Sequence, residues 1–248
     1  MDDIDSKQDT INKPERIKIP KVQLALLGII LIGYPVMATV MNYINPPNEV
    51  VIESRILQVY LPAVLFQALI FFSLLIAVIR VPLKQGDHYW SAVESLASIG
   101  IKRADFNWKN AALAVIFMFS AILILHVLSS IIGYYGFFQA EDISYLLPRT
   151  PFEKVIWIIL SLSAGIAEEL SFRGFVLTRM EILTGSIWPG IILGAFSFGI
   201  GHLYQGWAGV VLIGTYGMMF SLLFYARGSL IPCIIAHALQ DVLAIFAM

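Results

Sequence analysis

Residues 163–174 read SAGIAEELSFRG, and they lie inside an apolar stretch that runs from about residue 152 to 176. Glu168, Glu169 and Arg173 therefore fall where the surrounding residues predict a transmembrane helix. A charge near the centre of a bilayer costs at least about 2.5–3.5 kcal/mol on insertion scales. Charges so closely spaced in such a helix predict a polar site inside the membrane.

The composition of the rest of the chain also predicts a membrane protein. Of the 248 residues, 58% are hydrophobic and 13% are charged, whereas a soluble domain has about 45–50% apolar and about 25% charged residues. A membrane-spanning helix needs about 20 apolar residues. We therefore predict an all-α, polytopic bundle of about seven spans, approximately 22–44, 56–79, 111–133, 152–176, 187–203, 207–226 and 230–248.

Three parts of the chain differ in composition. Residues 1–21 form a polar tail for which we expect no regular structure, 22–150 hold the first three spans, and 151–248 form a C-terminal core. Between the second and third spans, Trp90 and Val93 begin an apolar pattern at helical spacing. This pattern predicts a short amphipathic helix lying in the membrane interface.

Lysines and arginines predict the orientation in the membrane. The tail carries five and the loop after the second span carries five, but the loops after the first and third spans carry one each. Cytoplasmic loops are enriched in these residues, so we expect a cytoplasmic N-terminus in a plasma membrane. The net charge of −1 gives no indication of a nucleic-acid partner.

Helical geometry separates the two glutamates of the fourth span. Glu169 and Arg173 are four residues apart with the acid first, which favours an ion pair. Glu168 points about 100° away from its neighbour and lacks that partner. A desolvated carboxylate without a cation beside it is a stronger base than one in water, as a general base requires. The alternative is a structural ion-pair cluster that joins helices.

Two later spans carry the remaining candidates. His202 follows a stretch of small residues that favours close helix contact, and His237 and Asp241 share one helix face. An acid beside an imidazole fixes its tautomer or lines a polar pocket with it. The alternative for His202 is a packing role, and for the pair a buried polar patch between helices.

Together these residues resemble three motifs of the CPBP family. The motifs are Glu168-Glu169-x-x-x-Arg173, Phe198-x-x-x-His202 and His237-x-x-x-Asp241. The family comprises CAAX-protease and bacteriocin-processing (Abi) intramembrane proteases and includes type II prenyl endopeptidases. The resemblance covers about residues 150–248. It implies a helical membrane core in which Glu168 is the general base, His202 holds the water, and His237 and Asp241 face the oxyanion.

The sequence departs from the family pattern at its last position. The third motif usually ends in asparagine, which donates hydrogen bonds, whereas an ionised Asp241 only accepts them. Asp241 is then protonated, orients His237, or helps to hold a metal. Two histidines and carboxylates suit zinc, so Glu168, His202, His237 and Asp241 are candidate ligands. We favour a metal-free mechanism, because Glu168 beside His202 is sufficient to activate water.

The sequence thus predicts an intramembrane endopeptidase whose partners are the bilayer and a peptide or membrane-protein substrate. CAAX-type tails, bacteriocin precursors and signalling-peptide precursors all remain open as substrates. A non-catalytic membrane scaffold of the same family and a proton-coupled transporter are the alternatives. The endopeptidase requires Glu168 and His202 to share one water, which we expect from a tilted or broken fifth span.

Overall fold

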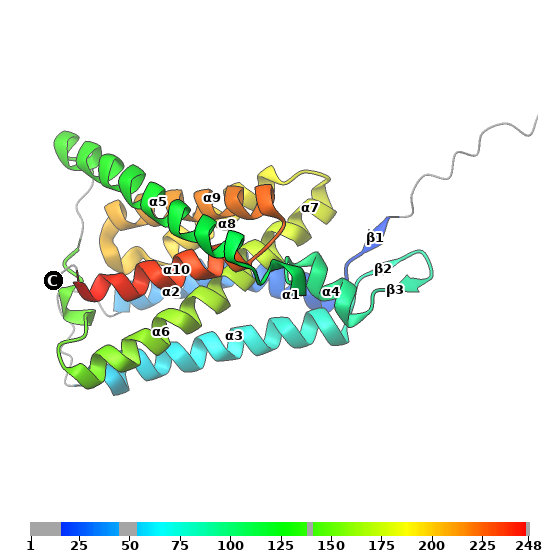
Figure 1. Ribbon diagram of the computed structural model, residues 1–248, viewed down its shortest axis with the longest axis horizontal. Helices are drawn as coiled ribbons and strands as arrows, with labels where there is room; N and C mark the ends of the chain where they lie inside the picture. The colour runs from blue at the N-terminus through cyan, green and yellow to red at the C-terminus, as the bar shows by residue number, and fades with distance from the viewer. Residues whose placement is uncertain (1–15, 45–53, 138–140, 247–248) are drawn as a thin grey trace, which may run out of the picture.

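Figure 1 shows the computed structural model, which describes residues 16–44, 54–137 and 141–246. Helices make up 82% of the structure and strands 3%, so the prediction of an all-α bundle is confirmed. The helices are α1 Lys21–Gly28, η1 Ile29–Gly33, α2 Tyr34–Ile44, η3 Ile56–Tyr60, α3 Leu61–Arg80, α4 Ala92–Ser98, η4 Arg103–Asp105, α5 Trp108–Tyr135, η5 Ser144–Leu146, α6 Pro151–Glu169, η6 Leu170–Leu177, α7 Thr178–Thr184, α8 Trp188–Ile200, η7 Leu203–Gln205, α9 Gly206–Arg227, α10 Ile231–Leu243 and η8 Ala244–Phe246.

Each of the seven predicted apolar segments contains helix. Within the described residues, five helical segments are long and apolar enough to cross a membrane: Lys21–Ile44, Ile56–Arg80, Trp108–Tyr135, Pro151–Thr184 and Leu203–Arg227. The other two are shorter apolar helices, Trp188–Ile200 and Ile231–Phe246. The chain is a multi-pass membrane protein.

The fourth span is longer than the sequence predicted, because it continues past residue 176 to Thr184. Its start is fixed by Thr150 and Glu153, whose side chains each accept a hydrogen bond from the other residue's backbone N–H. No glycine or proline interrupts residues 176–184. The helix ends at Gly185, which adopts a φ of 72°, a conformation that favours glycine. Its middle, η6, is π-helical.

A small antiparallel sheet lies before the interfacial helix. It pairs β1 Ile17–Lys18 with β2 Lys84–Gln85, and β2 with β3 His88–Tyr89. The expectation of no regular structure in the tail is therefore wrong for Ile17–Lys18, while residues 1–15 lie outside the described residues. The tail forms a strand there because the β2–β3 hairpin offers it a free edge.

The predicted amphipathic helix is present as α4, which is only seven residues long. Ser91 and Glu94 cap its start, since each side chain accepts a hydrogen bond from the other's backbone N–H. These bonds hold the pKa of Glu94 below its usual range, with the Ser91 backbone N–H making the largest contribution.

Beyond α4, the Gly100 carbonyl accepts a hydrogen bond from the Leu230 backbone N–H at 2.9 Å. This contact ties the interfacial segment to the start of α10.

Helices α6 and α10 lie side by side (Figure 1). The indole N–H of Trp157 donates to the backbone carbonyl of Asp241 at 2.8 Å. Further along the same interface, a Cβ at Gly165 would lie only 3.1 Å from the Ala238 backbone nitrogen. Glycine at 165 therefore lets the helix backbones approach closely, which brings the end of α6 against the middle of α10.

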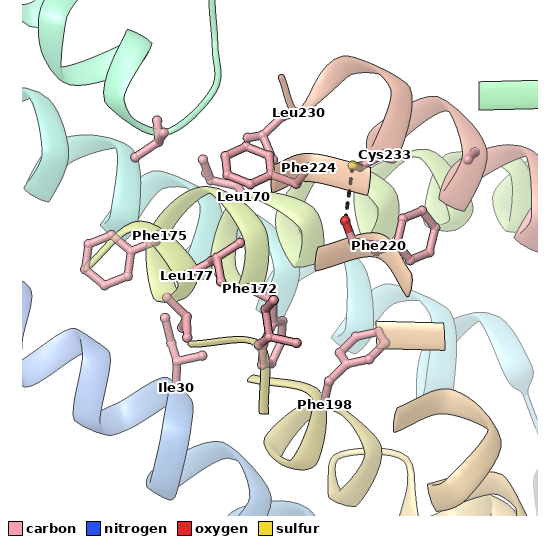
Figure 2. Close-up of a cluster of buried hydrophobic side chains, with 14 of the residues drawn as sticks. Ile30, Leu170, Phe172, Phe175, Leu177, Phe198, Phe220, Phe224, Leu230 and Cys233 are labelled. Carbon is pink, nitrogen blue, oxygen red and sulfur yellow. Dashed lines mark hydrogen bonds between the residues drawn. The ribbon is translucent and has the colours of Figure 1, made fainter. Parts of the chain in front are cut away.

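Figure 2 shows the apolar cluster that surrounds this junction. Phe172 and Phe175 come from η6, Phe198 from α8, Phe220 from α9 and Leu230 from the turn before α10. All five side chains are buried. The described C-terminal helices thus form one packed core, which fixes the relative positions of the polar residues that they carry.

The contact between α8 and α9 depends on Gly199. A Cβ at this position would lie 2.6 Å from the Val210 carbonyl oxygen. We expect Gly199→Ala to lower the free energy of unfolding by about 1–3 kcal/mol, as overpacking does. Gly133→Ala in α5 is the matched control, because a Cβ there meets no atom within 4 Å. Thermal unfolding in detergent tests the pair; equal melting temperatures would contradict the close contact.

Candidate active site

The three motifs lie on four neighbouring elements. Glu168 and Glu169 end α6, and Arg173 follows in η6. His202 lies just after α8, and His237 and Asp241 are on α10. The structure therefore brings residues that are about 70 positions apart in the sequence into one region of the C-terminal core.

The ion pair predicted between Glu169 and Arg173 is present. Arg173 Nη1 donates to Glu169 Oε1 at 3.0 Å, and the two side chains are 1% and 0% exposed. Arg173 Nη2 donates to the Gly217 carbonyl of α9 at 3.0 Å. The guanidinium carbon lies 4.8 Å from the ring centre of Phe198 and 5.1 Å from that of Phe220. Aromatic faces and a carboxylate thus stabilise this buried cation.

Glu169 also contacts His237, a link that the sequence analysis did not identify. Glu169 Oε1 lies 2.7 Å from His237 Nδ1. A carboxylate only accepts hydrogen bonds, so we assign the proton to Nδ1. The imidazole also stacks on Phe220, with ring centres 5.6 Å apart. Glu169 therefore fixes the orientation of His237 and leaves Nε2 facing the other two acids.

The two remaining acids lie on the Nε2 side of this imidazole. His237 Nε2 is 3.8 Å from Glu168 Oε2 and 3.6 Å from Asp241 Oδ2. Both distances exceed hydrogen-bond length. Among the described residues, Glu168 Oε2 has no hydrogen-bond partner, although the atom is buried. Glu169 Oε2 is likewise buried without a partner in the described residues, but Glu169 Oε1 is held by Arg173 and His237, whereas Glu168 has no such contact.

A cavity of about 210 Å³ lies beside Glu168. This space is large enough for a water molecule, since one occupies about 30 Å³ in the liquid. Its wall comes from both halves of the chain and consists of Ile30, Tyr34, Ala63, Phe66, Gln67, Ile70, Ala167, Glu168, Ser171 and Phe172. The Glu168 cavity, as we call it, is therefore apolar around one carboxylate, one phenol, one amide and one hydroxyl.

His202 occupies a break between helices. Helix α8 ends at Ile200, and the chain then enters the 3₁₀ turn η7, so the predicted break near the glycines is present. His202 Nδ1 lies 2.8 Å from the Phe198 carbonyl oxygen. A carbonyl only accepts, so Nδ1 is assigned the proton and a neutral ring keeps a lone pair on Nε2. The sharing of one water with Glu168 stays a prediction.

The first two spans contribute polar groups that the sequence analysis did not assign to the site. The sequence pattern alone did not distinguish Tyr34, Gln67 or Ser163 as site residues. Ser163 Oγ donates to Gln67 Oε1, and both Tyr34 and Gln67 line the Glu168 cavity. A polar residue within an otherwise apolar span was the available signal for Gln67.

The donor set does not form a metal site. The Nδ1 contacts of His237 and His202 leave Nε2 of each ring as the nitrogen that could bind a metal. Among the described residues, no group of three or more His, Cys, Asp and Glu side chains is placed to hold a metal ion. The zinc site that the sequence left open thus does not fit this arrangement of side chains.

The fold and these contacts define a multi-pass membrane protein with a buried acid–imidazole cluster. Residues 150–243 match the family model described as type II CAAX prenyl endopeptidase Rce1-like. This family is a protease family, so the resemblance drawn from the three motifs is confirmed over this segment, and it supports a CAAX-type intramembrane protease in general. No curated protein and no solved structure matches the chain.

The buried ion pair predicts a large effect of removing its cation. Arg173→Met would leave Glu169 buried without its compensating charge, so we expect a loss of about 3–5 kcal/mol in the free energy of unfolding. Arg103→Met is the control, because Arg103 is exposed. Chemical or thermal unfolding in detergent measures both variants. An Arg173→Met protein as stable as the Arg103→Met protein would contradict the structural role of the Glu169–Arg173 ion pair.

Proposed function

We propose that this protein is an intramembrane endopeptidase that hydrolyses a peptide bond in a membrane-associated protein or peptide. One observation carries the proposal: a buried carboxylate oxygen of Glu168 has no partner in the described residues and borders a cavity that accommodates water. Burying a carboxylate without a partner destabilises the protein. A role in chemistry accounts for its presence, and the protease-family match over the same segment supports that role.

Glu168 acts as the general base in this proposal. Its carboxylate takes a proton from water, and the hydroxide oxygen attacks the peptide carbonyl carbon. When the tetrahedral intermediate collapses, the C–N bond breaks and Glu168 returns the proton to the leaving amine nitrogen. His202 holds the water, because its Nε2 lone pair accepts a hydrogen bond while the Phe198 carbonyl fixes the ring.

The second acid of the first motif and the third motif have supporting roles. Glu169 and Arg173 hold His237 in place beside the carbonyl oxygen on which negative charge develops. Asp241 lies 3.6 Å from His237 Nε2. Of the three roles that the sequence allows for Asp241, we favour orientation of His237 by charge attraction, since 3.6 Å places the acid beside the ring but exceeds hydrogen-bond length.

The substrate approaches from the membrane. The described spans carry many exposed apolar side chains, as lipid contact requires. We propose a peptide or a tail of a membrane-associated protein as substrate, with a CAAX-type tail, a bacteriocin precursor or a signalling-peptide precursor as its possible forms. The distribution of Lys and Arg supports a cytoplasmic N-terminus, and we propose the plasma membrane as the location.

Removal of the proposed base tests the function. We expect Glu168→Gln to lower kcat by about 100-fold or more, because general-base catalysis contributes about 10²–10⁴. The assay uses purified protein in lipid vesicles with a library of internally quenched peptides. Glu181→Gln is the control, since Glu181 is an exposed glutamate in α7. Full cleavage by Glu168→Gln would contradict the assignment and favour the scaffold alternative.

A chelator separates the two mechanisms that the sequence left open. Because the described donor set does not fit a metal ion, we expect cleavage by the wild type to be unchanged after dialysis against EDTA. The same peptide assay measures the rate before and after treatment. A loss of activity that added zinc restores would show that a metal takes part.

A further inference from the structure

Tyr34 carries a hydroxyl group that the mechanism above does not use. It begins α2 in the first span and lines the Glu168 cavity. No hydrogen bond of its hydroxyl is found within the described part of the chain, whereas the Tyr60 hydroxyl donates to the Leu146 carbonyl at 2.7 Å. A phenol in an apolar surrounding normally finds a partner. An unpartnered one beside a reactive carboxylate is therefore free to bind a substrate.

The position of Tyr34 is set by the segment that carries His202. A Cβ at Gly201 would lie 2.1 Å from Tyr34 Cε1 and 2.4 Å from its hydroxyl oxygen. Only the absence of a side chain at 201 lets the ring lie there. The ring also meets Phe172 edge-on, with centres 6.0 Å apart. The phenol is thus held between the residue preceding His202 and the wall of the Glu168 cavity.

The proposed oxyanion site needs a donor. An ionised Asp241 carboxylate offers acceptors only. The Nδ1–H of His237 already donates a hydrogen bond to Glu169. Its Nε2 faces the carboxylates of Glu168 and Asp241. A developing oxyanion requires preorganised donors. The Tyr34 hydroxyl is a neutral donor in the cavity that Glu168 borders.

We propose that Tyr34 is a catalytic residue that donates a hydrogen bond to the scissile carbonyl oxygen. This inference rests on the proposed function. As the hydroxide derived from water attacks the carbonyl carbon, the C=O π electrons move onto oxygen, and the Tyr34 O–H stabilises that charge without losing its proton. When the C=O bond re-forms and the C–N bond breaks, the amine nitrogen takes the proton held by Glu168.

Tyr34→Phe tests this role, because it removes only the hydroxyl. We expect kcat to fall by about 10- to 100-fold with KM unchanged, as for an interaction made chiefly in the transition state. The melting temperature should not change, since the ring contacts remain. Tyr225→Phe is the matched control, because Tyr225 is 58% exposed on α9. The peptide cleavage assay in phosphatidylcholine vesicles supplies both kinetic constants.

The outcomes separate this inference from the proposed function. If the wild type cleaves and Tyr34→Phe keeps its kcat, the role of Tyr34 is overturned while the endopeptidase stands. A Tyr34→Phe protein that loses activity only through a raised KM or a lowered melting temperature also overturns it, in favour of ring packing. Absence of cleavage by the wild type across the library would overturn both.

Discussion

One oxygen atom of Glu169 holds the site together. It accepts from Arg173 at 3.0 Å and lies 2.7 Å from His237 Nδ1. Through these partners it joins the end of α6 to η6 and α10, and Arg173 extends the connection to the Gly217 carbonyl of α9. Its position in a fully buried environment strengthens each contact. The proposed catalytic groups stay in place because this fixed network surrounds them.

Glu168 and Glu169 are neighbours in sequence but have different surroundings. The α-helical rotation of about 100° between consecutive residues directs Glu169 toward the cation and leaves Glu168 on the cavity side. Each acid has a buried Oε2 without a hydrogen-bond partner in the described residues. Oε1 of Glu169, however, binds Arg173 and His237, whereas Glu168 borders the cavity. We therefore assign a structural role to Glu169 and propose the catalytic role for Glu168.

Local patterns in the sequence were enough to predict the spans and the pairing of Glu169 with Arg173, because both depend on residues close together in the chain. The Glu169–His237 contact joins positions 68 residues apart, and helical periodicity carries no information on such pairs. The place of Tyr34 likewise depends on a glycine far along the chain, Gly201. The length of the fourth span was underestimated because its end is set by Gly185 rather than by hydropathy.

The central claim is that Glu169 and His237 act as one unit, and a double-mutant cycle tests it most directly. The free energies of unfolding of Glu169→Gln, His237→Ala and the double variant are compared with the wild type. Residues in contact show interaction energies of about 0.5–3 kcal/mol, and the buried 2.7 Å contact predicts a value in the upper part of that range. Additive effects of the two substitutions would contradict the account.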